Sequence, residues 1–131
     1  MTPRELFDQR VQLIHENRWH DLAQQYAPEA VVEIPFAPPR PIRLVGRDAI
    51  AAQLARAGTL RLAFAVRDVV VHETADPEVI IVEYGYDLTD PDSGRTAAVD
   101  NIQLFRVRDG LIVHTRDFHD HRAIAELLSR S

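Results

Sequence analysis

The segment DNIQLFRVRDGLIVHTRDFHD, residues 100–120, contains two runs in which apolar and polar residues alternate. The runs flank Arg108-Asp109-Gly110, which is typical of a β-hairpin turn. In the second run, a period of two places Thr115, Asp117 and His119 on one face of a strand. A carboxylate and an imidazole on one face suggest a site that transfers protons, although a solvated surface also has this pattern.

The loop length decides which residues lie opposite one another in this hairpin. A three-residue loop with Gly110 in the left-handed conformation pairs Val107 with Leu111 and Asn101 with Asp117. Gln103 and Thr115 then share the face of Asp117, and a polar patch forms between apolar neighbours. A two-residue loop changes the register and weakens this prediction.

The rest of the chain predicts helices first and strands afterwards. Thr2-Pro3-Arg4-Glu5 is typical of a helix start, and Asp120 is expected to cap a final helix. The predicted helices cover residues 3–15, 20–26, 47–57 and 121–128, and the predicted strands cover 31–34, 61–73, 79–88, 95–107 and 111–119. We therefore predict one α+β domain, residues 1–131, whose curved antiparallel sheet wraps around the N-terminal helices as a cone-shaped barrel.

Composition excludes several classes of function. With 131 residues, 46% hydrophobic content and a net charge of −5, we expect no nucleic-acid partner and no anionic membrane surface. No apolar stretch approaches the roughly 20 residues of a membrane span. The N-terminus lacks a charged-then-apolar signal pattern, so we expect a cytoplasmic protein.

Missing residue types narrow the chemistry further. The chain contains no Cys and no Lys, which excludes thiolate nucleophiles and lysine Schiff bases. No glycine-rich phosphate loop is present. In a strand His114 points away from His119, so we expect no metal site and no cofactor. Acid/base chemistry by Asp, Glu, His and Tyr remains, or no chemistry at all.

Short motifs follow one another in a characteristic order along the chain: residues 19–31, Pro35-Phe36, Gly46-Arg47-Asp48-Ala49-Ile50, Glu73, Asp76-Pro77, Val82-Glu83-Tyr84, Asn101, residues 105–112 and Arg116-Asp117-Phe118. Together with the order of helices and strands, these motifs resemble the SnoaL-like branch of the ketosteroid-isomerase/nuclear-transport-factor-2-like superfamily, which implies a cystatin-like fold. The second half is most similar to phenazine-biosynthesis A/B-type members. The resemblance implies that the acidic residue at the position of Asp117 lies in the pocket and carries catalysis.

Asp117 is the first candidate for a catalytic residue, and His119 is the second. A partly desolvated Asp117 would have a raised pKa suited to proton transfer. Alternatively, Asp117 pairs with Arg116 or another arginine at the end of the sheet. His119 either works with Asp117 or lies at the rim of a fraying strand.

The other candidates are ligand-binding residues. Glu83 interrupts an apolar strand, so it either faces a cavity or pairs with an arginine. Asn101, Gln103 and Thr115 belong to the polar patch. Further candidates are aromatic and line the core or the pocket wall: Trp19, Tyr26 and Phe36. Residues 35–41 are rich in proline, and we expect them to form the pocket rim with Phe36 pointing inward.

These observations favour a small enzyme of the isomerase, cyclase or dehydratase type. Its ligand would be a small apolar molecule that bears a carbonyl or enol group. The alternative is a noncatalytic ligand-binding or dimerisation domain of the same fold. We also expect a homodimer through the outer face of the sheet, which we predict to carry Ile102, Leu104, Ile112 and Phe118, with Tyr84 and Tyr86 nearby.

Overall fold

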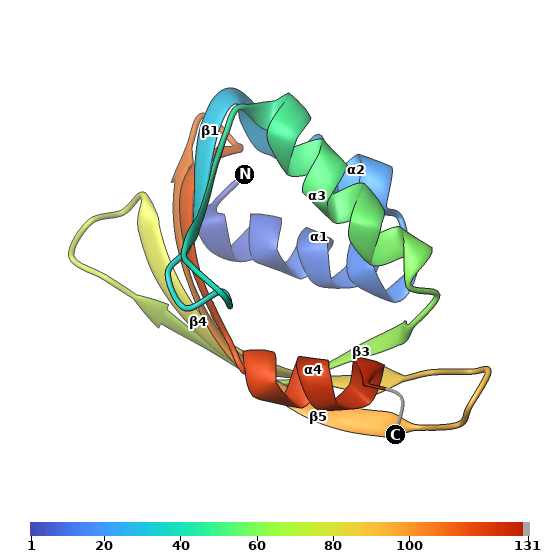
Figure 1. Cartoon of the computed structure of the whole chain (residues 1–131). Helices are drawn as coiled ribbons and strands as arrows, with labels where there is room; N and C mark the ends of the chain where they lie inside the picture. The colour runs from blue at the N-terminus through green and yellow to red at the C-terminus, as the bar shows by residue number, and fades with distance from the viewer. Residues whose placement is uncertain (130–131) are drawn as a thin grey trace.

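The computed structural model describes residues 1–129, which form four helices and one six-stranded sheet (Figure 1). In chain order the elements are α1 (Pro3–His15), α2 (Trp19–Ala23), β1 (Tyr26–Ile34), β2 (Ile42–Val45), α3 (Arg47–Thr59), β3 (Ala63–Glu73), β4 (Val79–Thr89), β5 (Thr96–Arg108), β6 (Leu111–His119) and α4 (His121–Leu128). Figure 1 shows α1, α2 and α3 on the concave side of the strongly curved sheet, with α4 at its opposite end. The predicted α+β cone is therefore confirmed.

The sheet has the strand order β2-β1-β6-β5-β4-β3, and one of its pairings is parallel. β1 runs parallel to β6, whereas every other neighbouring pair is antiparallel. The prediction of an antiparallel sheet is thus wrong at one position. Turn signals predict only hairpins between strands adjacent in sequence, and β1 and β6 are separated by most of the chain.

Both predicted N-terminal caps are confirmed. Thr2 and Glu5 form a reciprocal capping box on α1, and the Asp120 side chain accepts a hydrogen bond from the amide of Ala123. Two helix boundaries differ from the prediction. Tyr26 begins β1 instead of ending α2, and α3 continues through Gly58. A Cβ at Gly58 would lie 2.8 Å from Cδ1 of Trp19, so α2 and α3 can approach this closely only because the residue is glycine.

The hairpin between β5 and β6 combines a two-residue loop with a bulge. Arg108 pairs with Leu111, and Asp109 and Gly110 have positive φ angles of 53° and 77°. The predicted three-residue loop is therefore wrong. The bulge lies between the pairs Val107–Ile112 and Arg106–His114, where β6 contains one extra residue and the register shifts. The two-residue loop alone would turn Asp117 to the outer face of the sheet. The extra residue in the bulge turns it back, so Asp117 faces inward.

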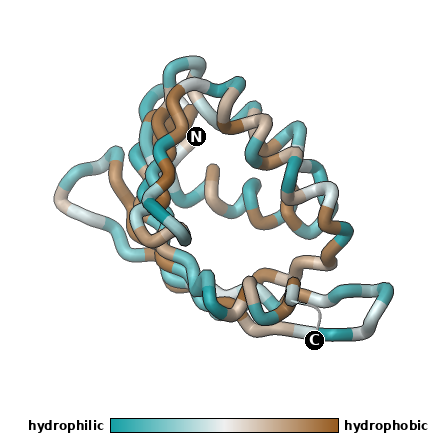
Figure 2. Tube along the Cα trace, in the orientation of Figure 1, coloured by the Kyte–Doolittle hydropathy of each residue, from teal (hydrophilic) through white to brown (hydrophobic). Residues whose placement is uncertain are grey.

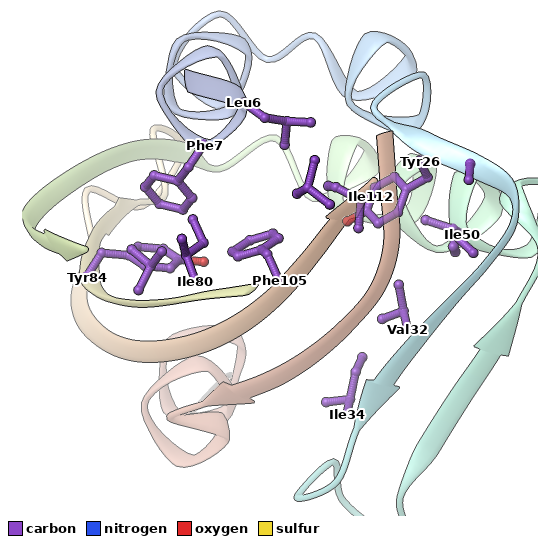
Figure 3. Packing of buried hydrophobic residues seen from close by; sticks show 14 of the residues in the cluster. Leu6, Phe7, Tyr26, Val32, Ile34, Ile50, Ile80, Tyr84, Phe105 and Ile112 are labelled. Atoms are coloured by element: carbon purple, nitrogen blue, oxygen red, sulfur yellow. The ribbon is translucent and has the colours of Figure 1, made fainter. Parts of the chain in front are cut away.

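The core lies between α1 and the concave face of the sheet. Figure 3 shows Phe7 pointing from α1 toward Tyr84, Ile80 and Phe105, and its ring centroid lies 5.4 Å from that of Tyr84. Figure 2 shows hydrophobic and hydrophilic residues alternating along the strands. Within residues 1–129, no helix is long and apolar enough to cross a membrane.

Candidate functional site

A row of polar side chains follows the inner face of β5 and β6. The cross-strand pairs are Asn101–His119, Gln103–Asp117 and Phe105–Thr115. The predicted common face of Thr115, Asp117 and His119 is confirmed, but the predicted partner of Asp117 is wrong. Asp117 lies opposite Gln103 instead of Asn101, because the loop and the bulge together shift the register by two residues.

Asp117 lies at the end of a hydrogen-bonded chain. It is 7% exposed, and its Oδ1 accepts a hydrogen bond of 2.9 Å from Nε2 of Gln103. The hydroxyl of Tyr84 donates to Oε1 of Gln103, and the Tyr86 hydroxyl lies 3.2 Å from that of Tyr84. Because the Tyr84 proton is used toward Gln103, Tyr86 is the donor in that contact. This series of hydrogen bonds fixes the orientation of the Gln103 amide, which in turn holds one carboxylate oxygen of Asp117 in place.

Arginine pairing does not account for Asp117. Among residues 1–129 no arginine forms an ion pair with it, and Arg116 instead lies over the ring of Phe118, 5.4 Å from the ring centroid. The alternative in which Asp117 pairs with Arg116 is therefore wrong. The strand period separates the two side chains, since neighbours along a strand point to opposite faces.

His119 is oriented by Asn101. Its Nδ1 lies 2.7 Å from Oδ1 of Asn101, which can only accept, so Nδ1 carries the proton and Nε2 keeps its lone pair. Burial lowers the pKa of His119, although the charge of Asp117 opposes this effect. His119 is therefore held as a neutral imidazole, the form that accepts a proton.

Thr115 and Tyr26 complete the inner wall. Thr115 is 0% exposed, and its hydroxyl has no hydrogen-bond partner among residues 1–129. Burial raises the pKa of the Tyr26 hydroxyl, so Tyr26 remains neutral at physiological pH. Tyr26 thus contributes an aromatic wall to the site.

Three predicted ligand-binding residues lie away from this inner face. Glu83 is exposed on β4 and lines the outer side of the sheet, and its partner is His72 of β3 instead of the arginine given as one alternative. Phe36 is 70% exposed and packs edge-on against Phe118, so the expectation that it points inward is wrong. Trp19 packs against Phe64 and Gly58 between helices and sheet.

Sequence reasoning missed one inner residue, Arg10, and the predicted place of Tyr86 near the outer face is wrong, because its hydroxyl lies 3.2 Å from that of the inner-face Tyr84. Arg10 is buried on α1, within the stripe of Leu6, Phe7, Leu13 and Ile14. A charged residue inside an apolar stripe of helical period was the signal that could have identified it. Tyr86 shares the face of Tyr84 by the period of two, and burial raises the pKa of both hydroxyls.

A depression of about 590 Å³ lies on the outer side of the sheet. Outward-facing residues supply most of its lining, among them Arg67, Val70, Glu83, Ile102 and Phe118. Asp117 is not part of this lining, whereas Asn101 and His119 are. As for metals, His119 and His121 have ring centroids 5.7 Å apart, but residues 1–129 contain no cluster of three or more potential ligands around them.

The comparison with known families agrees with the fold. The SnoaL-like domain family matches residues 7–115, so the chain belongs to this family. An uncharacterised PhzA/B-like protein of Pseudomonas aeruginosa is 34% identical over 119 residues, which cover 90% of this chain and 84% of that protein.

Solved structures show the same fold in more distant proteins. A proposed isomerase from Bacillus subtilis has a TM-score of 0.86 at 23% identity, covering 94% of this chain and 89% of that one. A proposed polyketide cyclase from Pseudomonas putida KT2440 has a TM-score of 0.81 at 16% identity, covering 98% and 99%. At these identities the likeness concerns the fold alone.

Proposed function

We propose that this protein is an acid/base enzyme that isomerises, cyclises or dehydrates a small molecule bearing a carbonyl or enol group. The observation that carries the proposal is the inner-face pair of Asp117 and His119, each oriented by its own amide side chain. Membership of the SnoaL-like family supports it, as does the description of a fold neighbour as a proposed polyketide cyclase.

In the proposed reaction Asp117 takes a proton from carbon next to the carbonyl group and returns it to another atom. Gln103 holds Oδ1 of Asp117, which leaves Oδ2 for the substrate. His119 presents the lone pair of Nε2 as a second base, and a hydroxyl or amide of the inner face stabilises the developing enolate. This scheme uses no cofactor and no metal, and both absences remain predictions, as does the cytoplasmic location.

Proton exchange with solvent tests this proposal on simple model ketones. The protein is incubated in D₂O with a panel of enolisable ketones, and NMR measures deuterium incorporation next to the carbonyl. We expect Asp117→Asn to keep the fold and lower the exchange rate about 100-fold or more. Asp100→Asn, on the exposed outer face of β5, is the matched control and should leave the rate unchanged. Equal rates in wild type and Asp117→Asn would contradict the proposal.

A second candidate is a noncatalytic domain that dimerises through the outer face of the sheet. Three apolar side chains are exposed there, Val70 by 48%, Ile102 by 46% and Phe36 by 70%. The predicted surface needs correction, because Ile112 is 0% exposed, Tyr84 is buried on the inner face and Tyr86 lies beside it there. The bulge in β6 turns Ile112 inward.

We propose a homodimer on this corrected surface, whether or not the protein is an enzyme. Sedimentation at micromolar concentration should show a dimer, and Ile102→Glu should dissociate it by burying a charge at the contact. Leu60→Glu is the control, since Leu60 is 45% exposed at the end of α3 and away from this surface. A monomeric wild type would refute the dimer.

A further inference from the structure

Arg10 places a positive charge inside the cone. It lies on α1 three or four residues from Leu6, Phe7, Leu13 and Ile14, all of which are buried. Residues at this spacing share one helix face, so Arg10 points with them toward the sheet. Its exposure is only 6%, which is rare for an arginine that lacks a carboxylate partner.

One N–H group of the Arg10 guanidinium, at Nε, has no hydrogen-bond partner within the described part of the chain. Nη1 donates to Oε1 of Gln25 over 3.4 Å, a long hydrogen bond to a neutral group. Nε has no partner among residues 1–129, and no carboxylate in that range forms an ion pair with Arg10. The guanidinium carbon lies 5.5 Å from the ring centroid of Tyr26 and 5.7 Å from that of Phe105. The Tyr26 hydroxyl also interacts with the guanidinium, whereas the aromatic rings attract the cation without accepting the hydrogen of Nε–H.

Thr115 provides a second, independent observation at the same level of the sheet. Its hydroxyl is fully buried without a hydrogen bond in the described chain, and it pairs across strands with Phe105, over which Arg10 lies. Buried polar atoms in native proteins nearly always have partners. Nε–H of Arg10 and the hydroxyl of Thr115, both close to Phe105, therefore indicate that a bound ligand completes their hydrogen bonds.

We infer that Arg10 binds a carboxylate group of the ligand, with the Thr115 hydroxyl as a second donor. A guanidinium matches a carboxylate in charge and in its planar, forked geometry, whereas a neutral carbonyl offers it neither an opposite charge nor a second oxygen. The inference rests on the proposed function, because it places the ligand in the same interior. It changes the expected ligand from a purely apolar molecule to one with an acidic end.

The strand period also sets a length for this ligand. The Phe105–Thr115 pair and the Gln103–Asp117 pair are two residues apart along β5 and β6. Two residues of a strand span about 7 Å, so the carboxylate and the reacting carbonyl or enol are separated by roughly that distance. A bifunctional molecule with an acid at one end and an enolisable group at the other fits both positions.

A matched pair of probes tests the inference. 4-Hydroxybenzoate carries a carboxylate and an enol-like hydroxyl at opposite ends of one ring, and 4-hydroxybenzamide has the same shape without the charge. Calorimetry at pH 7 should show at least 10-fold tighter binding of the benzoate. Arg10→Gln should abolish this preference, and Arg10→Lys should retain part of it. Arg67→Gln, on the outer face, should leave the preference unchanged.

A direct observation of Arg10 covers the case in which its variants fail to fold. In the wild type, the NMR signal of the Arg10 Nε–H group should shift when the benzoate is added and remain in place with the benzamide. Equal binding of the two probes, binding of neither, or an unchanged Arg10 signal would overturn the inference.

The two proposals fail in different ways. If deuterium exchange depends on Asp117 but the benzoate binds no more tightly than the benzamide, the carboxylate site is refuted and the proposed enzyme activity stands. If the benzoate binds more tightly through Arg10 but deuterium exchange does not depend on Asp117, the proposed enzyme activity is refuted and a binding site for acidic ligands stands.

Discussion

Replacing Thr115 by valine should stabilise the protein. The substitution exchanges the buried, unsatisfied hydroxyl for a methyl group of nearly the same shape at a position that is 0% exposed. An unsatisfied buried hydroxyl costs about 1–3 kcal/mol, and a buried methyl group adds a further fraction of the roughly 0.8 kcal/mol typical of a methylene. We therefore expect a gain of at least about 1 kcal/mol in the free energy of unfolding. For a domain of this size the thermal midpoint should rise by about 3–5 °C.

The matched control is Thr74→Val in the turn before β4. The Thr74 hydroxyl lies 2.9 Å from the carbonyl oxygen of Val79 and accepts a hydrogen bond of 3.2 Å from the amide of Asp76. Its loss should cost about 1 kcal/mol, the opposite sign to Thr115→Val. Urea denaturation of the two variants measures both values. A Thr115→Val protein that is less stable than wild type by about 1 kcal/mol or more would refute the reasoning, because the hydroxyl would then have a partner in solution.

Two further predictions concern the two faces of the sheet. A Cβ at Gly85 would lie 2.5 Å from Nη1 of Arg67, so the guanidinium would have to shift away from its ion pairs with Asp87 and Asp100. Gly85→Ala should therefore lower the thermal midpoint of the wild type. In an Arg67→Ala background the same change should raise stability by about 0.5–1 kcal/mol, because alanine is then favoured over glycine. The same sign in both backgrounds would show that Arg67 does not constrain Gly85. On the inner face, burial lowers the pKa of His119, so the unfolded chain binds a proton more readily and stability should fall as the pH drops below the ordinary histidine pKa of about 6.5. Denaturation of His119→Gln at pH values of about 7.5 and 5.5, on either side of that pKa, should show a smaller loss than the wild type, and an equal loss would contradict the lowered pKa.

Local sequence determined the ends of several elements, because capping and turn chemistry act over a few residues. Thr2 with Glu5 marks the start of α1, and Asp120 marks the start of α4. Asp109-Gly110 marks the turn of the hairpin, and the period of two in β6 correctly places Asp117 and His119 together. Each of these signals needs only neighbouring side chains and the geometry of the backbone.

Tertiary structure decided which groups meet across the cone. The bulge in β6 turns Ile112 into the core and sets Asp117 opposite Gln103, and no turn rule predicts an extra residue inside a strand. The parallel pairing of β1 with β6 depends on a connection through most of the chain. Arg10 faces Tyr26 and Phe105 only because α1 packs on the concave side of the sheet. The sequence therefore determined the chemical groups and their local faces, and long-range packing determined which of them lie at one site, because burial and pairing depend on residues distant along the chain.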